Sequence, residues 1–212
     1  MNGKFLYKIF AWITAVMALS SCSDSDFWEP DQPVPEGYIP ISFKADIPEM
    51  QTVNTRAVDA DGIGVQNMTL FCFDSYGLFI TTVHADLSIT SQTTGTFKSA
   101  VPTHTRAIHF VGNEVMTDFS EDDYRNKSEA EVMATLEGSS GRMIYWARFA
   151  CDANNTASIA DQLKAAPYNN TITLIRNHAK ISLVNPSNQW ISITGMAVVN
   201  PNAFGTVAPY HP

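Results

Sequence analysis

The stretch Tyr38–Ala57, YIPISFKADIPEMQTVNTRA, decides how the rest of the chain is interpreted. Its first half alternates polar residues with an apolar face made of Ile39, Ile41, Phe43 and Ala45. This period of two predicts a strand with one buried face. The second half is a polar run that ends at Arg56, where we expect a trypsin-like protease to reach the chain.

Cleavage after Arg56 would create a new N-terminus at Ala57 and separate the strand Ile39–Ala45 from the chain that follows. The sheet would then hold an apolar groove with unpaired backbone groups, which a strand from another chain can fill. Residues 38–56 are therefore a candidate removable strand segment.

Residues 1–21 have the organisation of a bacterial lipoprotein signal peptide. Lys4 and Lys8 form a basic start, and the apolar run Ile9–Leu19 follows. Leu19-Ser20-Ser21-Cys22 then matches a lipobox, in which small residues precede a cysteine. We expect cleavage before Cys22 and its acylation, because several acyl chains hold a protein on a membrane. The alternative is an ordinary signal peptide with a chance cysteine.

Residues 22–37 form the expected tether. Ser23-Asp24-Ser25-Asp26 follows the cysteine, and acidic residues there resemble the surface-export signal of Bacteroidota lipoproteins. A merely solvated linker is the other interpretation. Pro30, Pro33 and Pro35 favour an extended chain.

Composition argues against several classes of function. A hydrophobic content of 45% in 212 residues supports a substantial core. Without Lys4 and Lys8, the 13 basic residues become 11 against 21 acidic ones, a net charge of −10. Because no basic patch remains, we do not expect a nucleic-acid partner. Beyond the leader, no apolar run reaches the length of about 18 residues that indicates a membrane span.

Two cysteines remain if Cys22 is acylated. Cys72 lies inside an apolar strand and Cys151 follows another candidate strand. In an exported chain they could form a disulfide or stay as free, partly buried thiols, and the sequence leaves both open.

A hairpin is predicted after the protease site. Val65–Asp74 and Leu78–His84 are apolar strand patterns on either side of Asp74-Ser75-Tyr76-Gly77, a turn with Gly77 placed for positive φ. On the first strand one face is Met68, Leu70 and Cys72, and the other is Phe71 and Phe73.

The remaining pattern is mostly short strands. They are expected at Thr93–Ala100, Arg106–Asn113, Met143–Phe149, Thr171–Arg176, Ala179–Asn185 and Trp190–Asn200. In Arg106–Asn113 we expect Ile108 and Phe110 inward and His109 opposite them. Eight to ten strands in all predict an antiparallel β-sandwich over residues 38–212.

One or two short helices interrupt the strands. Ser128 and Glu131 form a capping box at the start of a helix, which Gly138 is expected to end. Its apolar face is Val132, Met133 and Leu136. A second helix is expected around Ile159–Leu163.

No catalytic, cofactor or metal site is predicted, so we do not expect an enzyme. No GxSxG elbow or Gly-rich phosphate loop occurs. Glu121-Asp122-Asp123 lacks the alternating spacing of a calcium loop and favours a solvated face or a helix start. The histidines lack metal-binding spacing, which favours structural or exposed roles for His84, His104, His109, His178 and His211.

Together these motifs resemble the Bacteroidales type V fimbrillin family. The leader, the strand, the Thr55-Arg56-Ala57 site and the FDSYG turn resemble the family's opening. RAIHFVGN, LIRNHAKISLV (with Arg176, Ala179 and Lys180) and GMAVVNPNAFGTVAPY resemble later segments of its N-terminal domain. The resemblance runs from Ile39 to Tyr210.

The resemblance implies a transthyretin-like β-sandwich in a subunit of a cell-surface fimbria. Such subunits reach the outer membrane as lipoproteins, an Arg-specific protease cuts them, here between Arg56 and Ala57, and they polymerise by exchange of a donor strand. Expected partners are other fimbrial subunits and, before processing, the outer membrane. Whether cleavage occurs, and a role as stalk, anchor or tip, stay open.

The resemblance has one departure. Family members usually carry a second sandwich domain whose C-terminal strand is the donor, whereas this sequence stops at Pro212. We therefore expect a truncated chain or a variant that does not donate in the usual way.

The alternative function is a non-polymerising surface lipoprotein that binds a glycan or a host ligand. Trp28, Trp146 and Trp190 could stack on sugars, although an aromatic in an alternating strand more often belongs to a core. Trp146 and Trp190 together on an exposed flat face would favour this alternative.

Overall fold

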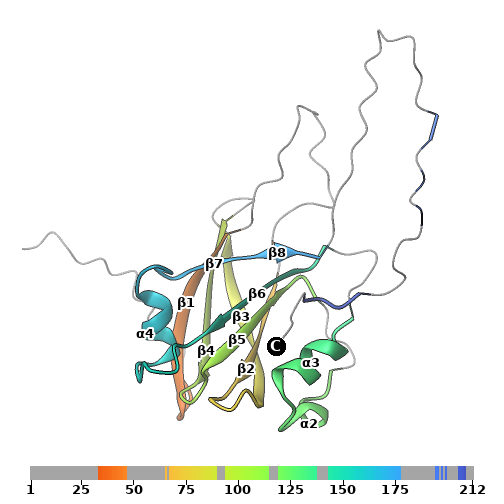
Figure 1. Cartoon of the computed structure of the whole chain (residues 1–212). Coiled ribbons are helices and arrows are strands. Elements are labelled where there is room, and N and C mark those ends of the chain that lie inside the picture. Colours follow the sequence, from red (N-terminus) through yellow and green to blue (C-terminus); the bar gives the residue numbers. More distant parts are fainter. Residues whose placement is uncertain are drawn as a thin grey trace, which may run out of the picture. The chain divides into compact units, whose positions relative to one another are not determined.

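The computed structural model describes residues 33–46, 65, 67–89, 94–114, 119–137, 143–177, 194, 195, 197, 199 and 205–208, with only the backbone for 88, 89, 94 and 95. These residues form an all-β, sandwich-like fold with short helices at its sides (Figure 1). The strands are β1 Tyr38–Asp46, β2 Met68–Phe73, β3 Phe79–Ile89, β4 Thr94–Pro102, β5 Ala107–Gly112, β6 Tyr145–Ala150, β7 Thr171–Thr173 and β8 Ile175–Arg176. The helices are α2 Glu121–Tyr124, α3 Glu129–Thr135 and α4 Ile159–Lys164.

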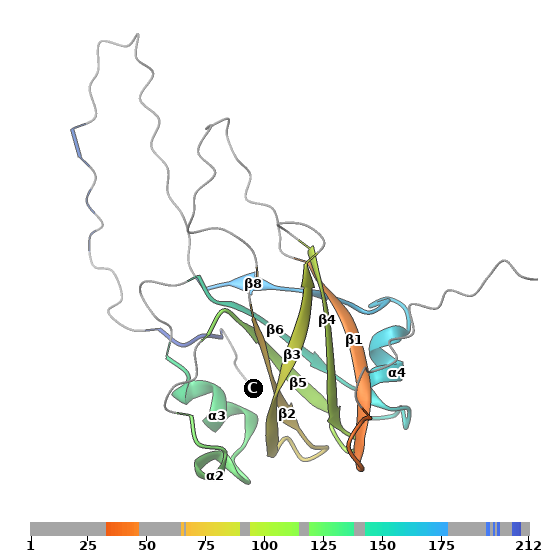
Figure 2. The ribbon, with the colours of Figure 1, turned by 180° about the vertical axis from the view of Figure 1, so that it is seen from behind.

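The strands form a single sheet in the order β7-β1-β4-β3-β2-β5-β6-β8. The long strand β3 pairs with two different strands. Its first part, up to Ala85, pairs with β2, and its second part, from Asp86, pairs with β4. The sheet therefore passes from one layer of the sandwich to the other along β3. Figure 2 shows β3, β4 and β1 side by side.

The two ends of this sheet are joined by one short piece of chain. β7 pairs with β1 at one end of the strand order, and β8 pairs with β6 at the other. Leu174 alone separates β7 from β8, and its side chain is fully buried. The chain thus crosses between the layers at β3 and again at Leu174, which closes the sandwich on both sides.

The main core lies between the two layers. Apolar faces of β1 and β4 meet those of β2, β5 and β6, and α4 adds Ile159 and Leu163 from one end. Phe43 of β1 stacks on Phe97 of β4 and contacts Phe110 of β5 edge-on.

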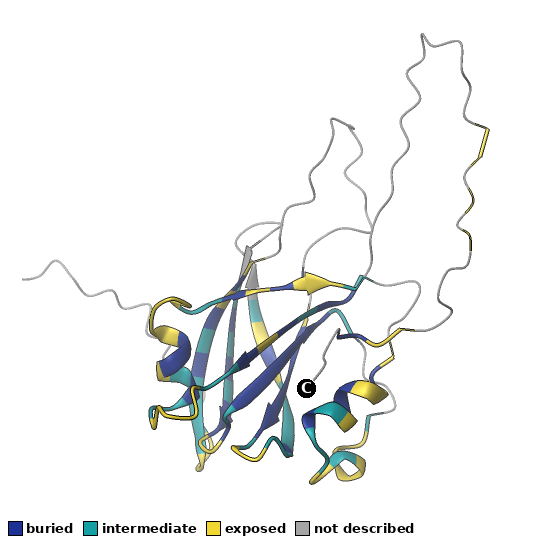
Figure 3. Ribbon diagram, in the orientation of Figure 1, coloured by how far each residue is buried: buried dark blue, intermediate teal, exposed yellow. Residues whose placement is uncertain are grey.

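A second core covers the other face of β2 and β5. Phe71 and Phe73 of β2 pack there against Val132 and Met133 of α3, and Tyr124 of α2 borders the cluster. Every residue of β2 and of β5 is consequently buried, and Figure 3 shows both strands in the colour of buried residues. The predicted division of β2 into two apolar faces is confirmed, because each face belongs to a different core.

The predicted hairpin between β2 and β3 is also confirmed. Asp74 Oδ1 accepts the backbone N–H groups of Tyr76 at 2.8 Å and Leu78 at 2.9 Å. Gly77 has φ +72°, a left-handed conformation that glycine adopts without steric cost.

The capping box at Ser128 is present as predicted. Ser128 Oγ accepts the Glu131 N–H, and Glu131 Oε2 accepts the Ser128 N–H at 2.8 Å. The helix ends earlier than predicted, at Thr135, whereas Gly138 lies outside the described residues. Glu121-Asp122-Asp123 starts α2, as the helix-start interpretation anticipated, and α4 matches the second predicted helix.

The all-β, sandwich-like fold is as predicted, and its strands differ from the prediction in two details. One pair is parallel, because the chain returns through α4 and β7 reaches β1 in the same direction. The predicted strand Thr171–Arg176 is divided at Leu174, where the backbone leaves β1 for β6. Residues 179–185 lie outside the described part, and residues 194, 195, 197 and 199, the described part of the last predicted strand, are not in a strand.

Candidate functional site

Strand β1 is the part of the sequence-predicted site that the structure describes. Its odd-numbered residues carry the apolar face, as the alternation predicts: Ile41, Phe43 and Ala45 are buried and Ile39 is partly buried. Burying a large apolar side chain such as Ile41 or Phe43 contributes roughly 1.5–3 kcal/mol each. β1 is therefore held first by its contacts with the main core.

Backbone pairing holds β1 on both sides. Along its whole length, from Tyr38 opposite Pro102 to Asp46 opposite Thr94, it pairs with β4. On its other side, within the described part of the chain, Lys44–Asp46 pair in parallel with β7 and the rest of β1 has no strand neighbour. The Lys44 N–H points to the β7 side, so alternation places the backbone of Pro40 on that side as well. A proline suits a position without a strand neighbour, because it has no N–H to leave unpaired.

A second strand edge, on the first part of β3, is capped by a side chain. Glu121 Oε1 accepts the backbone N–H of Thr82 at 2.7 Å and the hydroxyls of Thr81 and Thr82 at 2.8 Å each. Burial on its own would raise the pKa of Glu121, but these hydrogen bonds outweigh it and lower the pKa. The capped Thr82 N–H is not available to an added strand.

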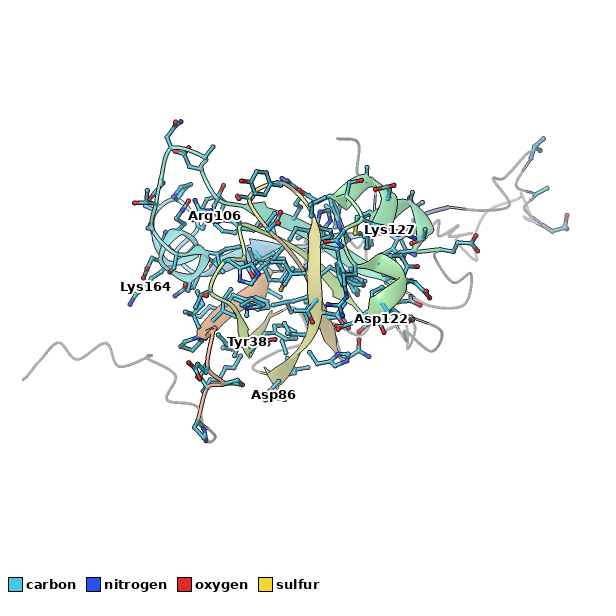
Figure 4. The ribbon with its side chains drawn as sticks, turned by 90° about the horizontal axis from the view of Figure 1, so that it is seen from below. Tyr38, Asp86, Arg106, Asp122, Lys127 and Lys164 are labelled. Carbon is cyan, nitrogen blue, oxygen red and sulfur yellow. The ribbon has the colours of Figure 1, made fainter. Side chains whose placement is uncertain are left out.

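Of the predicted processing residues, Cys22, Arg56 and Ala57 lie outside the described residues. Arg106, directly before β5, is described. Its guanidinium donates to the carbonyl oxygens of Asp152, Asn155 and Ala157. Its backbone is paired too, since its N–H bonds the Phe73 carbonyl and its carbonyl accepts from Cys151. Figure 4 shows Arg106 on the same side of the molecule as Lys164 of α4.

Sequence reasoning missed a buried polar cluster between β5, β6 and α3. His109 Nε2 lies 2.8 Å from Glu129 Oε2, and Trp146 Nε1–H donates to His109 Nδ1 at 3.1 Å. Because Nδ1 accepts, the proton of the neutral ring is on Nε2 and is donated to Glu129. Arg148 completes the cluster with two bonds to the Glu129 carboxylate, at 2.6 and 3.0 Å.

The electrostatics of this cluster follow from burial and pairing. Burial lowers the pKa of His109 below its usual 6.5, although Glu129 acts in the opposite direction. Burial on its own would raise the pKa of Glu129, but hydrogen bonds from His109 and Arg148 outweigh it and lower the pKa to about 2. At neutral pH the cluster is a neutral imidazole, a carboxylate and a guanidinium, which fixes α3 on the sheet.

The other histidines do not form a site in the described part of the chain. His84 is exposed, with Nδ1 3.3 Å from the Thr69 hydroxyl, and His104 is exposed. His178 and His211 lie outside the described residues. No group of three or more histidine, cysteine or carboxylate side chains suited to a metal ion occurs among the residues that the structure describes.

Both described cysteines are free thiols, which resolves the alternative that the sequence left open. Cys72 is fully buried in the main core, and burial raises the pKa of its thiol to about 12. Burial also raises the pKa of Cys151.

The proposed aromatic platform is described only in part. Trp146 is half-buried, packs against the second core and donates its indole N–H to His109. Trp28 and Trp190 lie outside the described residues. Among the described helices, none is long and apolar enough to cross a membrane.

Comparison with known proteins gives a weak structural likeness. No family model and no curated protein matches the chain. A fimbrial assembly protein from Parabacteroides distasonis is similar in structure at a TM-score of 0.38 and 11% sequence identity. The match covers 65% of this chain and 52% of that one, so it spans about half of that protein's length.

Proposed function

We propose that this chain is a structural subunit, anchor or tip component of a cell-surface fimbria. In this proposal, proteolysis at Arg56 frees β1, and a strand of another subunit replaces it. The observation that carries the proposal is the place of β1: an internal position between β4 and β7, with its apolar side chains in the main core.

The geometry suits replacement of a strand better than addition at an edge. Loss of β1 would uncover the backbone of β4 over nine residue positions and the pocket that Phe43 fills between Phe97 and Phe110. An incoming segment would gain main-chain hydrogen bonds from β4 and side-chain pockets at every second residue. At the edge of β3, by contrast, the Thr82 N–H already donates to Glu121.

The same proposal includes the route and the partners. Acylation at Cys22 holds the exported chain on the outer membrane before processing, and other fimbrial subunits supply the replacing strand. The chain has no catalytic role and requires no cofactor in this scheme. The resemblance of its motifs to the fimbrillin family supports this arrangement.

A strand-uptake measurement tests the proposal. The full chain is cut with an Arg-specific protease and mixed with an excess of fluorescent peptide of the sequence Tyr38–Asp46. We expect the cut chain to take up the peptide and the uncut chain to exclude it. A peptide with Phe43→Asp should bind at least about tenfold more weakly, because it places a charge in an apolar pocket. Equal uptake by cut and uncut chains, or none by the cut chain, would overturn the proposal.

The alternative of a glycan-binding lipoprotein has less support. Its described candidate, Trp146, already uses its indole N–H for His109, and part of its ring packs on the second core. A sugar platform needs an open aromatic face.

A further inference from the structure

Asn170 joins β1 to helix α4 through its backbone. Its N–H donates to the carbonyl of Leu163, the last buried residue of α4, at 2.9 Å. Its carbonyl accepts the Lys44 N–H of β1 at 2.6 Å. Further along, the Leu174 N–H donates to the Asp46 carbonyl at 2.8 Å. Two bonds therefore close over the C-terminal end of β1, one at each end of β7.

The turn before β7 is built to hold this position. Asn169 and Asn170 both have left-handed backbones, with φ +49° and +57°. The N–H groups of Tyr168 and Asn169 both donate to the Ala165 carbonyl, and the Tyr168 ring packs edge-on against Phe149 of β6 at 4.8 Å. The turn is thus fixed to both α4 and the second layer.

The residues from α4 to Leu174 also contribute side chains to the main core, where the apolar residues of β1 are buried. Ile159 and Leu163 of α4, Ile172 of β7 and Leu174 are all buried in the main core together with Phe43. Residues 159–174 are called the latch below.

We propose that the latch, and not cleavage at Arg56, sets the rate at which β1 leaves. The latch grips Lys44–Asp46, the end of β1 that leads toward Arg56. A cut strand peels from its new free end, so the bonds to Asn170 and Leu174 must open before the ladder to β4 does. This inference rests on the proposed function for its biological meaning, but the grip itself is measurable in the uncut chain.

The chain offers a matched set of variants. Asn170→Ala places an alanine at a left-handed backbone position. Alanine disfavours this conformation, so the change should weaken the turn that holds the Asn170 carbonyl against Lys44. Asn170→Gly accepts that backbone freely. Asn126→Ala makes the same change at φ +64° in the turn between α2 and α3, whose helices border the second core. It is the control for a general loss of stability.

The first measurement is amide hydrogen exchange of the uncut full chain. In Asn170→Ala the Lys44 amide should exchange roughly five- to tenfold faster than in the wild type, as expected for the strain of one left-handed alanine. The Phe43 amide, which alternation directs to β4, should change by less than about twofold. Asn170→Gly and Asn126→Ala should leave the Lys44 amide near its wild-type rate. A Lys44 rate that is equal in Asn170→Ala and Asn126→Ala would overturn the latch.

The second measurement is release of the fluorescently labelled β1 fragment after cleavage. We expect Asn170→Ala to release it roughly five- to tenfold faster than the wild type and Asn126→Ala. Equal release by the two alanine variants would overturn the inference. To separate this result from a failure of the proposed function, a second form carries the site of another sequence-specific protease in place of residues 51–57. If Arg56 resists its protease but this form shows the ordering above, the latch holds and the proposed processing site fails.

Discussion

The ring of Phe43 meets the ring of Phe110 edge-on, with 4.8 Å between ring centroids and 69° between ring planes. Phe43 belongs to β1 and Phe110 to β5, and β4, β3 and β2 separate these strands in the sheet. The contact therefore spans the sandwich from one layer to the other. Phe97, directly opposite Phe43 on the neighbouring strand β4, stacks on it with ring centroids 5.4 Å apart. One side chain of the candidate removable strand thus sits at the centre of the main core.

Truncation of this side chain should be costly. We expect Phe43→Ala to lower the free energy of unfolding by about 3–5 kcal/mol, because it removes a fully buried ring and leaves a cavity between two others. Urea denaturation of the full chain measures it. Lys44→Ala, at the next and exposed position, should change it by less than about 1 kcal/mol. A loss at Phe43 no larger than at Lys44 would show that β1 does not contribute to the core.

The two faces of β2 should behave as separate cores. Leu70→Ala and Phe73→Ala should each destabilise by roughly 2–5 kcal/mol, since both side chains are fully buried. Because Leu70 packs in the main core and Phe73 in the second, the double variant should equal the sum within about 0.5 kcal/mol. A melting temperature within about a degree of wild type for either single variant would refute the assignment of faces.

Local patterns predicted the parts of this fold that local chemistry determines. The alternation of Ile41, Phe43 and Ala45 placed the buried face of β1 correctly, and the Ser128–Glu131 spacing located the start of α3. Both signals lie within a few residues of sequence, where backbone geometry alone fixes which side chains meet.

Features made by distant residues were not predictable in this way. His109 and Trp146 are 37 positions apart, and Glu129 had a sufficient explanation as a residue in the first turn of a helix. Only the packing of α3 against β5 and β6 brings them together. The division at Leu174 is similar, because its cause is that β1 and β6 lie in different layers. Asn169-Asn170 does carry a signal for left-handed backbone, but sequence does not say that β1 lies beside it.

The buried cluster predicts a stability that falls as the pH is lowered. Below pH 6.5 the unfolded chain protonates His109 more readily than the folded chain, in which burial lowers the pKa, so folding loses free energy. Below pH 4.5 unfolded Glu129 takes up a proton, whereas the folded state keeps the carboxylate until a pH of about 2. Each contribution is fully present above the pKa of the unfolded residue, 6.5 for His109 and 4.5 for Glu129, and declines as the pH falls below that value.

Urea denaturation at a series of pH values measures this dependence. Glu129→Gln should lower stability at pH 7 by about 1–3 kcal/mol, because it weakens the pairing of a buried group. It should also flatten the decline between about pH 5 and pH 3, where the wild-type carboxylate titrates in the unfolded state. Asp123→Asn, at an exposed position of α2, is the control and should keep the wild-type profile. Parallel profiles for the wild type and Glu129→Gln would contradict this account.

Membrane attachment should depend on one cysteine. Cys22→Ala removes the thiol at which the sequence predicts acylation, so the protein should leave the membrane fraction and lose the mass of its acyl chains. Cell fractionation and intact-mass spectrometry measure both effects. Cys151→Ser, which also removes one free thiol, should stay with the membrane. Unchanged retention of Cys22→Ala would exclude a lipid anchor at this residue.

Limited proteolysis should distinguish Arg56 from Arg106. Digestion of the full chain with an Arg-specific protease should cut first after Arg56 and give an N-terminus at Ala57, because a polar run precedes this arginine. Arg106 is the internal control: its guanidinium bonds three loop carbonyls and its backbone is paired with Phe73 and Cys151, so a protease must unfold this corner before it can bind.

The order of the two cuts also reports on the fold after cleavage. After the first cut, Arg106 should stay resistant for as long as β1 remains in place. The cut does not release β1 at once, because burial of the apolar face of β1, at about 25 cal/mol per Å², still stabilises its contact with the core. In Phe43→Ala this protection should weaken, and the second cut should follow the first more closely. N-terminal sequencing and intact mass at successive times give the order. A first cut at Arg106 would mean that the residues before Arg56 are less accessible than a paired strand, and the chain would then lack the processing site that strand replacement requires.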